Sequence, residues 1–203
     1  MKVTDIASPA SKPGSYRISV DDKPVGYISA EDMFELGIVL NNEIGKDAYE
    51  QLLFKVKYHA SYSDALRYVD RRLRTKAEVK HYLNSQGCDP DIGADIISRL
   101  QKLGLIDEKK VVQAYVHDAS LGQPKSRREL ELKLRQKQID PSLIKEELKR
   151  VDYDDGQVID QLIAKKSKLS AYANNQPKLF RYLLSKGFSY DDIAARIGRP
   201  KVN

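Results

Sequence analysis

The sequence lacks the features on which secreted and membrane proteins depend. It has one cysteine, Cys88, so no disulfide can form within the chain, and we expect its side chain to fill a helix corner as a small apolar residue. No apolar run approaches the roughly 20 residues that span a bilayer. The N-terminus also lacks the charged-then-apolar pattern of a signal peptide. These absences predict a soluble, cytoplasmic protein with no membrane partner.

Motifs for catalysis and for metal or nucleotide binding are missing as well. The chain has no GxxxxGK(S/T) phosphate loop, no GxGxxG, no HExxH and no paired cysteines for zinc. His59, His81 and His117 lie far apart in the sequence, which favours solvated or packed histidines over a shared metal. Acidic pairs such as Asp154-Asp155 suit helix caps or surface charges better than acid–base pairs. We therefore expect no enzyme, no metal and no cofactor.

The sequence does contain a segment that recurs at intervals of about 50 residues. Residues 76–90 are echoed by residues 127–141, and each position lies 51 residues after its counterpart, as Asp140 does after Asp89. A weaker third copy follows 49 residues later, over 177–190. Recurrence at this period is typical of helical repeat proteins.

The first two copies each contain a sequence signal for the start of a helix. Thr75 with Glu78, and Ser126 with Glu129, match the capping box, in which a hydroxyl and a carboxylate satisfy free N–H groups of the first helical turn. Behind each cap, apolar side chains recur at helical spacing. We therefore predict a helix beginning at each of the two caps.

The residues that follow predict a corner and a second helix in each copy. Gly87 and Gly187 stand where a helix would end in the left-handed conformation, and Gln138 departs from this pattern at the same place. Asp89-Pro90 and Asp140-Pro141 then provide an N-cap followed by proline at the first helical position. In the third copy, Ser189 with two aspartates after it has the same role. The repeating unit is a helix, a tight corner and a helix.

The first 60 residues have a different character. Residues 16–20 and 25–28 read as extended segments around a turn at 21–24, which predicts a β-hairpin, and residues 2–6 are a candidate for a further strand. Ser29 caps a short helix that stops at Gly37. A single hairpin is marginally stable, so we expect this module to pack on its own short helices.

Four more helices are predicted outside the repeated segment. One begins after Gly45 and runs through Val56, and a separate one precedes Thr75, with Tyr62, Leu66, Val69 and Leu73 as its apolar stripe. A helix that starts at Asp107 ends at Gly122-Gln123-Pro124. After an acidic break from Asp152 to Gly156, a longer helix is expected to reach Asn174-Asn175.

These elements predict a mainly α fold in four parts. Residues 1–60 form an N-terminal α+β extension with a β-hairpin and short helices, and residues 61–106, 107–151 and 152–203 form three tandem three-helix repeats. Such repeats bury their apolar faces only against neighbours, so we expect them to stack into an elongated, curved array.

Positive charge is concentrated in the repeats. Residues 1–61 hold 7 Lys and Arg against 9 Asp and Glu, a net of −2, whereas residues 62–203 hold 28 against 20, a net of +8. This imbalance favours an acidic partner, either nucleic acid or a protein bound to it. The candidate binding residues are Arg71, Arg72, Arg74, Lys125, Arg127, Arg128, Lys133, Arg135, Lys165 and Lys166. Lys137 and Lys168 accompany them. The alternative is that these are solvated helix faces with i,i+4 partners.

The repeated segment and its flanks resemble one known family. Arg74-Thr75-x-x-Glu78-Val79 is followed by Leu83-x-x-x-Gly87-Cys88, then by Leu100-x-x-Leu103-Gly104-Leu105-Ile106-Asp107-Glu108 and Ala114-Tyr115-Val116. Order and spacing resemble RecX, the bacterial regulator of the RecA recombinase, over roughly residues 61–188. Two positions depart from the family pattern, which commonly has an Arg near Ala119 and a Gly at Gln138.

The resemblance implies a non-enzymatic, monomeric protein of three three-helix repeats. Such a protein lies in the groove of the RecA filament on DNA and dampens ATP hydrolysis, strand exchange and co-protease activity. Single-stranded or filament-bound DNA is then a possible second partner. The alternative from the residues alone is a DNA-binding protein of helix-turn-helix type, with Ser126-Arg127-Arg128 at the N-terminal end of a base-reading helix.

Overall fold

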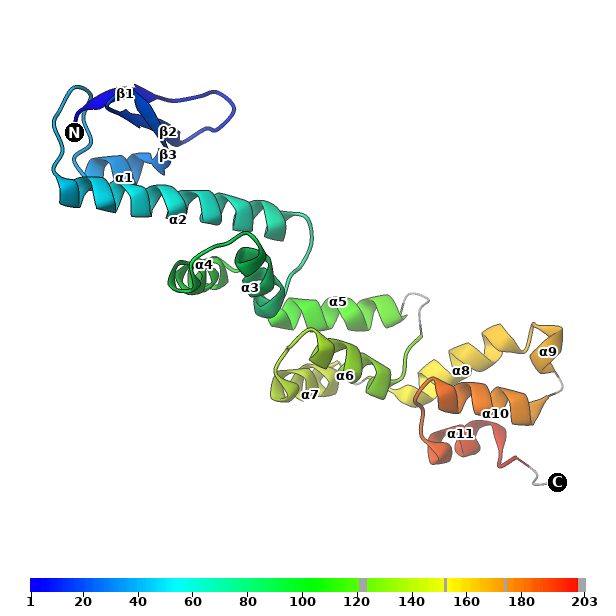
Figure 1. Ribbon diagram of the computed structural model, residues 1–203. Helices are drawn as coiled ribbons and strands as arrows, with labels where there is room; N and C mark the ends of the chain where they lie inside the picture. The colour runs from blue at the N-terminus through cyan, green and yellow to red at the C-terminus, as the bar shows by residue number, and fades with distance from the viewer. Residues whose placement is uncertain (121–123, 152, 174, 201–203) are drawn as a thin grey trace. The chain divides into compact units, whose positions relative to one another are not determined.

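The computed structural model describes residues 1–120, 124–151, 153–173 and 175–200 (Figure 1). These residues form three strands and eleven helices, which confirms the predicted mainly α class with a small N-terminal sheet. None of the described helices is long and apolar enough to cross a bilayer. The chain divides into two compact units, Met1–Arg72 with Val79–Ile106 and Leu73–Glu78 with Asp107–Asn203.

The N-terminal sheet is a three-stranded antiparallel meander. Its strands, in the order of the sheet, are β1 (Val3–Ala7), β2 (Ser15–Val20) and β3 (Lys23–Ser29). The predicted hairpin is confirmed, but its turn is tighter than expected, since Pro24 already pairs with β2. Asp21 and Asp22 both adopt left-handed φ angles of 49° and 62°, which suits the twist of a two-residue hairpin turn.

Two helices pack on this sheet. Figure 1 shows α1 (Ala30–Glu35) and the long α2 (Lys46–Asp70) beside it, and Ser29 caps α1 as predicted. Gly26 of β3 faces Val56 so closely that a Cβ would overlap the Val56 side chain, so only glycine allows this approach. The core of the module is a cluster of buried apolar side chains, Val3, Ile18, Val20, Ile28, Ile38, Ile44 and Leu52.

The prediction of two separate helices between Gly45 and Thr75 is wrong. A single helix of 25 residues, α2, runs through the expected break at residues 57–61 and ends at Asp70. No glycine or proline interrupts α2, so its series of backbone hydrogen bonds continues once the helix has formed. Leu73 lies beyond the end of α2 and is 46% exposed, so it is not part of the predicted apolar stripe. The boundary at residue 60 thus falls inside a helix, and the division into four parts stays a prediction.

The remaining helices follow the repeated pattern. They are α3 (Lys76–Ser85) and α4 (Pro90–Lys102); α5 (Glu108–Ser120), α6 (Arg127–Gln136) and α7 (Pro141–Arg150); α8 (Asp155–Lys166), α9 (Ser170–Ala173), α10 (Gln176–Ser185) and α11 (Tyr190–Ile197). Asp89, Asp140 and Ser189 cap α4, α7 and α11 as predicted. Gly87 and Gly187 are left-handed, with φ of 73° and 86°.

Gln138 holds the same left-handed conformation as the glycines it replaces, with φ of 58°. A residue with a Cβ is strained there, yet the corner between α6 and α7 is kept. The backbone N–H groups explain why: those of Lys137 and Gln138 bond to the last carbonyls of α6. The geometry of the corner therefore does not depend on glycine.

The expected long helix from Val158 to Asn175 is broken. Helix α8 ends at Lys166, where the Ser167 hydroxyl donates back to the Ile163 carbonyl, and a short α9 follows. Leu169, expected on the buried stripe, is 49% exposed. Asn175 is the N-cap of α10, so α9 and α10 are separate helices. The predicted boundaries at Gly122-Gln123, Asp152 and Asn174 lie outside the described residues.

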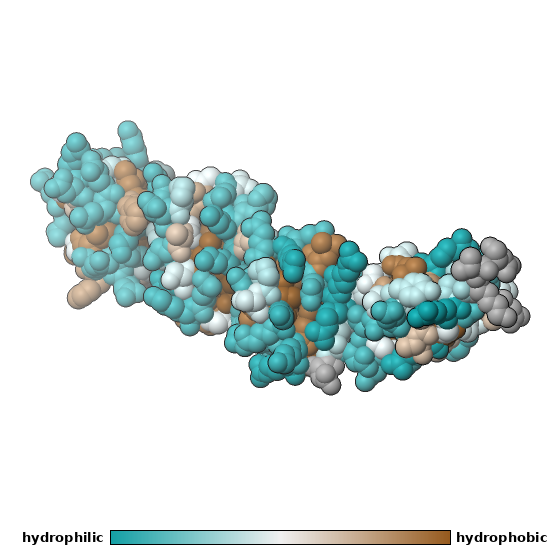
Figure 2. Space-filling view, turned by 90° about the horizontal axis from the view of Figure 1, so that it is seen from below, coloured by the Kyte–Doolittle hydropathy of each residue, from teal (hydrophilic) through white to brown (hydrophobic). Residues whose placement is uncertain are grey.

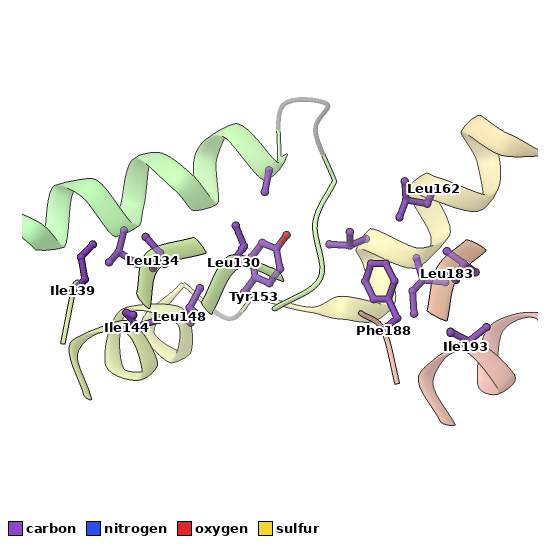
Figure 3. Packing of buried hydrophobic residues seen from close by; sticks show 14 of the residues in the cluster. Leu130, Leu134, Ile139, Ile144, Leu148, Tyr153, Leu162, Leu183, Phe188 and Ile193 are labelled. Carbon is purple, nitrogen blue, oxygen red and sulfur yellow. The ribbon is translucent and has the colours of Figure 1, made fainter. Parts of the chain in front are cut away.

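Each unit has its own helical core. In the first unit, Ala65 and Val69 of α2 pack against buried residues of α3 and α4, including Val79 and Ile96, and Cys88 packs against this cluster as expected. In the second unit, α5 to α11 share one continuous cluster. Its buried side chains include Ile159 and, labelled in Figure 3, Leu130, Leu134, Ile144, Leu148, Leu183 and Phe188.

Candidate interaction surface

A polar joint links the second repeat to the third at the start of α6. The Ser126 hydroxyl accepts a hydrogen bond from the Glu129 N–H at 3.1 Å and donates one to the Lys186 carbonyl at 2.7 Å. One residue on, the Arg127 N–H donates to Asp155 Oδ1 at 2.6 Å. A single buried serine thus caps its own helix and holds the C-terminal end of α10.

The same joint recurs 51 residues earlier, within the second unit. The Thr75 hydroxyl accepts from the Glu78 N–H at 3.2 Å and donates to the Lys137 carbonyl at 3.1 Å. The next N–H, that of Lys76, donates to Glu108 Oε1 at 3.2 Å. Thr75 and Ser126 are both fully buried. Within the second unit, the repeated caps therefore have two roles, since they start a helix and bond to the C-terminal end of a later helix.

Arg127 is part of this joint. Its guanidinium donates to the Tyr153 carbonyl at 2.6 Å, and the Tyr153 hydroxyl donates to the Lys125 carbonyl, also at 2.6 Å. Burial raises the pKa of Tyr153 to about 12, with a further contribution from the charge of Asp155. Burial also raises the pKa of Asp155, against the lowering effect of its hydrogen bond to Arg127. The arginine is thus engaged in packing rather than pointing freely to solvent.

The other predicted residues on α6 lie on its solvent-facing side. Lys133 pairs with Glu129 at 3.1 Å and Arg135 with Glu131 at 4.0 Å, the i,i+4 arrangement of a solvated helix face. Arg128 is exposed, with its aliphatic stem near Gly187. Exposed pairs of this kind are weak, so Lys133 and Arg135 can exchange their partners for an external anion at little cost.

The predicted clusters occupy equivalent places at the ends of helices. Arg71 and Arg72 follow the C-terminal end of α2, and Lys165 and Lys166 end α8, the corresponding helix of the third repeat. Arg74 and Lys125 directly precede the caps of α3 and α6, and both are half-buried. The visible surface in Figure 2 is mostly hydrophilic, with hydrophobic side chains showing as narrow strips.

A cluster of lysines and tyrosines in the third repeat was not predicted. Lys166 Nζ lies 5.3 Å and 4.7 Å from the ring centres of Tyr172 and Tyr182, and the two rings meet edge to face at 5.8 Å. Lys178 and Lys186 lie over the same rings at 5.1 Å and 5.8 Å. The recurrence of Tyr82 at Tyr182, 100 residues on, was the available sequence signal.

This arrangement suits an anionic partner. Ammonium groups over tyrosine faces gain cation–π energy but no neutralising charge, so their full positive charge stays available to phosphate or carboxylate. Within the described residues, no group of three or more His, Cys, Asp or Glu side chains is placed to hold a metal ion. The chemistry that the described residues of the second unit offer is electrostatic binding.

Comparison with known protein sequences finds relatives along most of the chain. A family model described as the first three-helix domain of RecX matches residues 62–100. The regulatory protein RecX of Streptococcus sanguinis is 26% identical over 94% of this chain and 73% of its own length. That of Clostridium botulinum (strain Eklund 17B) is also 26% identical, over 95% and 92% of the two chains.

Two solved structures are similar as well. A crystal structure of regulatory protein RecX superposes with a TM-score of 0.77 over 97% of this chain and 98% of its own, at 20% identity, which shows a shared fold. The crystal structure of RecX from Lactobacillus salivarius is 32% identical, with a TM-score of 0.57, over 68% of this chain and 93% of its own.

Proposed function

The chain belongs to the RecX family of regulatory proteins, and from this premise we propose that it binds the RecA filament on single-stranded DNA and inhibits it. Binding would dampen RecA's ATP hydrolysis, strand exchange and co-protease activity, and so limit recombination and DNA repair. The protein contributes no catalytic group. The likeness to RecX along almost the whole chain carries this proposal.

The positive charge of residues 62–203, a net of +8, supports the proposal. A filament on DNA carries phosphates as well as protein carboxylates, and both attract lysine and arginine. The proposed contacts are nine of the ten predicted residues, namely Arg71, Arg72, Arg74, Lys125, Arg128, Lys133, Arg135, Lys165 and Lys166. Arg127 is left out of the proposed contacts, because its guanidinium donates to the Tyr153 carbonyl in the joint.

The geometry of α6 weighs against the helix-turn-helix alternative. A base-reading helix must present the side chains of its N-terminal end to the major groove. Here Ser126 is fully buried, the Arg127 N–H is bonded to Asp155 and its guanidinium to Tyr153. Entry of this helix end into a groove would require the second and third repeats to separate.

The test of the proposal is RecA's single-stranded-DNA-dependent ATPase, with this protein added well below the RecA concentration. We expect the ATPase to fall at substoichiometric protein, while binding to bare DNA at the same salt stays weak. A fall that needs enough protein to coat the DNA would instead indicate competition for DNA, and would favour the direct DNA-binding alternative.

Charge reversal locates the contact surface. We expect Arg128→Glu with Lys165→Glu to weaken inhibition at least fivefold, because two attractive charges become repulsive, while circular dichroism stays unchanged. The matched control reverses Lys23 and Lys57, which are exposed residues of the N-terminal region outside these clusters. Equal inhibition by both double variants would exclude Arg128 and Lys165 from the contact.

A further inference from the structure

A groove in the first unit has a chemistry opposite to that of the basic clusters. It has a volume of about 550 Å³ and is lined by α1, α2 and α4 together with the end of β3. Its ionisable lining consists of five carboxylates, Glu31, Asp32, Glu35, Asp91 and Asp95, and two cations, Lys55 and Arg99, besides His59. Burial lowers the pKa of His59, so this imidazole adds no charge at neutral pH. The groove therefore carries a net charge of −3 in a chain whose net charge is +6.

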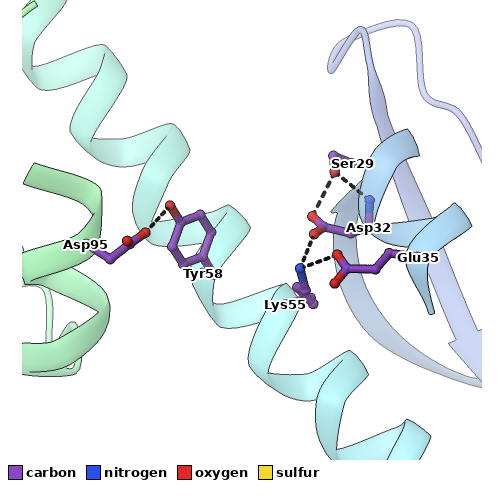
Figure 4. A network of polar contacts seen from close by, with 6 residues as sticks. All are labelled: Ser29, Asp32, Glu35, Lys55, Tyr58 and Asp95. Atoms are coloured by element: carbon purple, nitrogen blue, oxygen red, sulfur yellow. Dashed lines mark hydrogen bonds and ion pairs between the residues drawn. The ribbon is translucent and has the colours of Figure 1, made fainter. Parts of the chain in front are cut away.

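The two cations of the groove already have partners. Lys55 Nζ lies 2.8 Å from both Asp32 and Glu35, so one lysine pairs with two carboxylates; dashed lines in Figure 4 mark both contacts. On the other wall, the Arg99 guanidinium lies over the Tyr62 ring at 4.7 Å. Arg99 is exposed and shows how a guanidinium fits here, since its flat face rests on an aromatic ring.

Acidic groups remain for an incoming cation. Glu31 and Asp91 are exposed, and no hydrogen bond or ion pair within the described chain involves their carboxylates. Asp95 accepts the Tyr58 hydroxyl at 2.7 Å through Oδ2, which leaves Oδ1 for a second donor (Figure 4). These three carboxylates supply the acceptors that a guanidinium or ammonium group requires.

Exposed aromatic side chains accompany these charges. Phe54, which lines the groove, is 53% exposed, and Phe34, on the same short helix as Glu31 and Glu35, is 89% exposed. A large apolar side chain left in water beside a charged groove is typical of a protein-binding surface, where an apolar anchor is surrounded by a polar rim. A small inorganic cation would gain nothing from these rings.

We propose that this acidic groove binds a basic segment of a partner protein, with an arginine or lysine side chain between Asp91 and Asp95 and an apolar neighbour against Phe54. Charge complementarity selects the occupant, because the groove repels nucleic acid and attracts basic peptide. This site goes beyond the proposed function and does not depend on it. The groove and the basic clusters are thus surfaces of opposite charge.

The probe is the blocked tetrapeptide acetyl-Leu-Arg-Leu-Arg-amide, titrated into the full chain and followed by amide chemical shifts. We expect saturable shifts confined to α1, α4 and the groove side of α2, and binding that weakens with added salt. The same peptide with citrulline in place of arginine keeps the shape and removes the charge. It should bind at least fivefold more weakly. Shifts spread over the chain, or equal binding of the citrulline peptide, would overturn the proposal.

Variants of the chain test the walls of the groove. Asp91→Asn with Asp95→Asn should weaken binding at least fivefold, and asparagine keeps an acceptor for Tyr58 so that the fold is retained. The matched control, Glu43→Gln with Glu50→Gln, removes two exposed carboxylates outside the groove and should bind as the unaltered chain does. Equal loss in both pairs would reduce the effect to net charge and refute a defined site.

Self-association is the competing occupant. Sedimentation of the chain alone over a range of concentrations should give a monomer, unaffected by Phe54→Ala. A dimer that dissociates on addition of the tetrapeptide or in the Phe54→Ala variant would assign the groove to a second copy of the chain and overturn its assignment to a partner protein.

Discussion

Replacing Ser126 by alanine tests the joint between repeats most sharply. The hydroxyl of this fully buried residue makes two hydrogen bonds, one within α6 and one to the Lys186 carbonyl of α10. The variant removes both and leaves an acceptor without its donor. Ser189 is the matched control, because it caps α11 in the same way at 3.0 Å but is exposed, and its hydroxyl donates to Asp192 of its own helix and not to another helix.

The two substitutions should lower the free energy of unfolding by different amounts, and the difference is the contribution of the joint. Loss of an N-cap costs about 1 kcal/mol, and an acceptor left unsatisfied in a partly buried site costs about 1–3 kcal/mol more. We therefore expect Ser126→Ala to lower the free energy of unfolding by about 2–4 kcal/mol, and Ser189→Ala by about 1 kcal/mol.

Urea unfolding, followed by far-ultraviolet circular dichroism, measures both variants. Amide hydrogen exchange then shows where the loss falls, and we expect faster exchange in α6 and α10 for Ser126→Ala alone. If the two variants agree to within about 0.5 kcal/mol, the bond to Lys186 adds no stability. The reasoning on the joint would then be wrong.

Three further predictions follow from the same region. Gly187→Ala should cost at least about 1 kcal/mol more than Gly87→Ala by urea unfolding, because both are left-handed but only at Gly187 would the Cβ meet another group, the Ser126 hydroxyl at 2.9 Å; equal costs would contradict this. Gln138→Gly should raise stability by about 1 kcal/mol, since glycine has no penalty at φ of 58°; a lower melting temperature would contradict it. The pKa of Tyr153 is raised to about 12, so its stabilising effect is complete below the unfolded pKa of about 10 and is lost as pH rises toward 12; Tyr153→Phe should lose less stability over that interval, as measured by urea unfolding at each pH.

Local sequence signals predicted most of the repeated fold. Capping residues and corners act within one or two turns, so Thr75, Ser126, Asp89 and Asp140 could be assigned from neighbouring residues alone. The left-handed conformation of Gln138 was less obvious, because it is imposed by the corner and not by the residue type.

Helix ends without a local signal were predicted poorly. Nothing in the sequence around residues 57–61 indicates whether α2 continues, since a break and a continuation both satisfy the apolar spacing. The end of α8 at Lys166 was missed for a similar reason, because Leu169 and Tyr172 match helical spacing although a new helix, α9, begins between them.

The surfaces were the least predictable part. The basic residues were visible in the sequence, but the engagement of Arg127 with Tyr153 depends on a contact 26 residues away. The lysine–tyrosine cluster combines residues of α8, α9 and α10. The acidic groove draws on residues from Ser29 to Arg99, so no local pattern reveals it.

The central claim is that this chain recognises the RecA filament and not DNA alone. Co-sedimentation tests it directly, with the chain mixed at one salt concentration either with RecA filaments on single-stranded DNA or with an equal amount of the bare DNA. The account predicts that the chain pellets with the filaments and remains in solution with bare DNA. Equal pelleting with both, or none with the filaments, would contradict it.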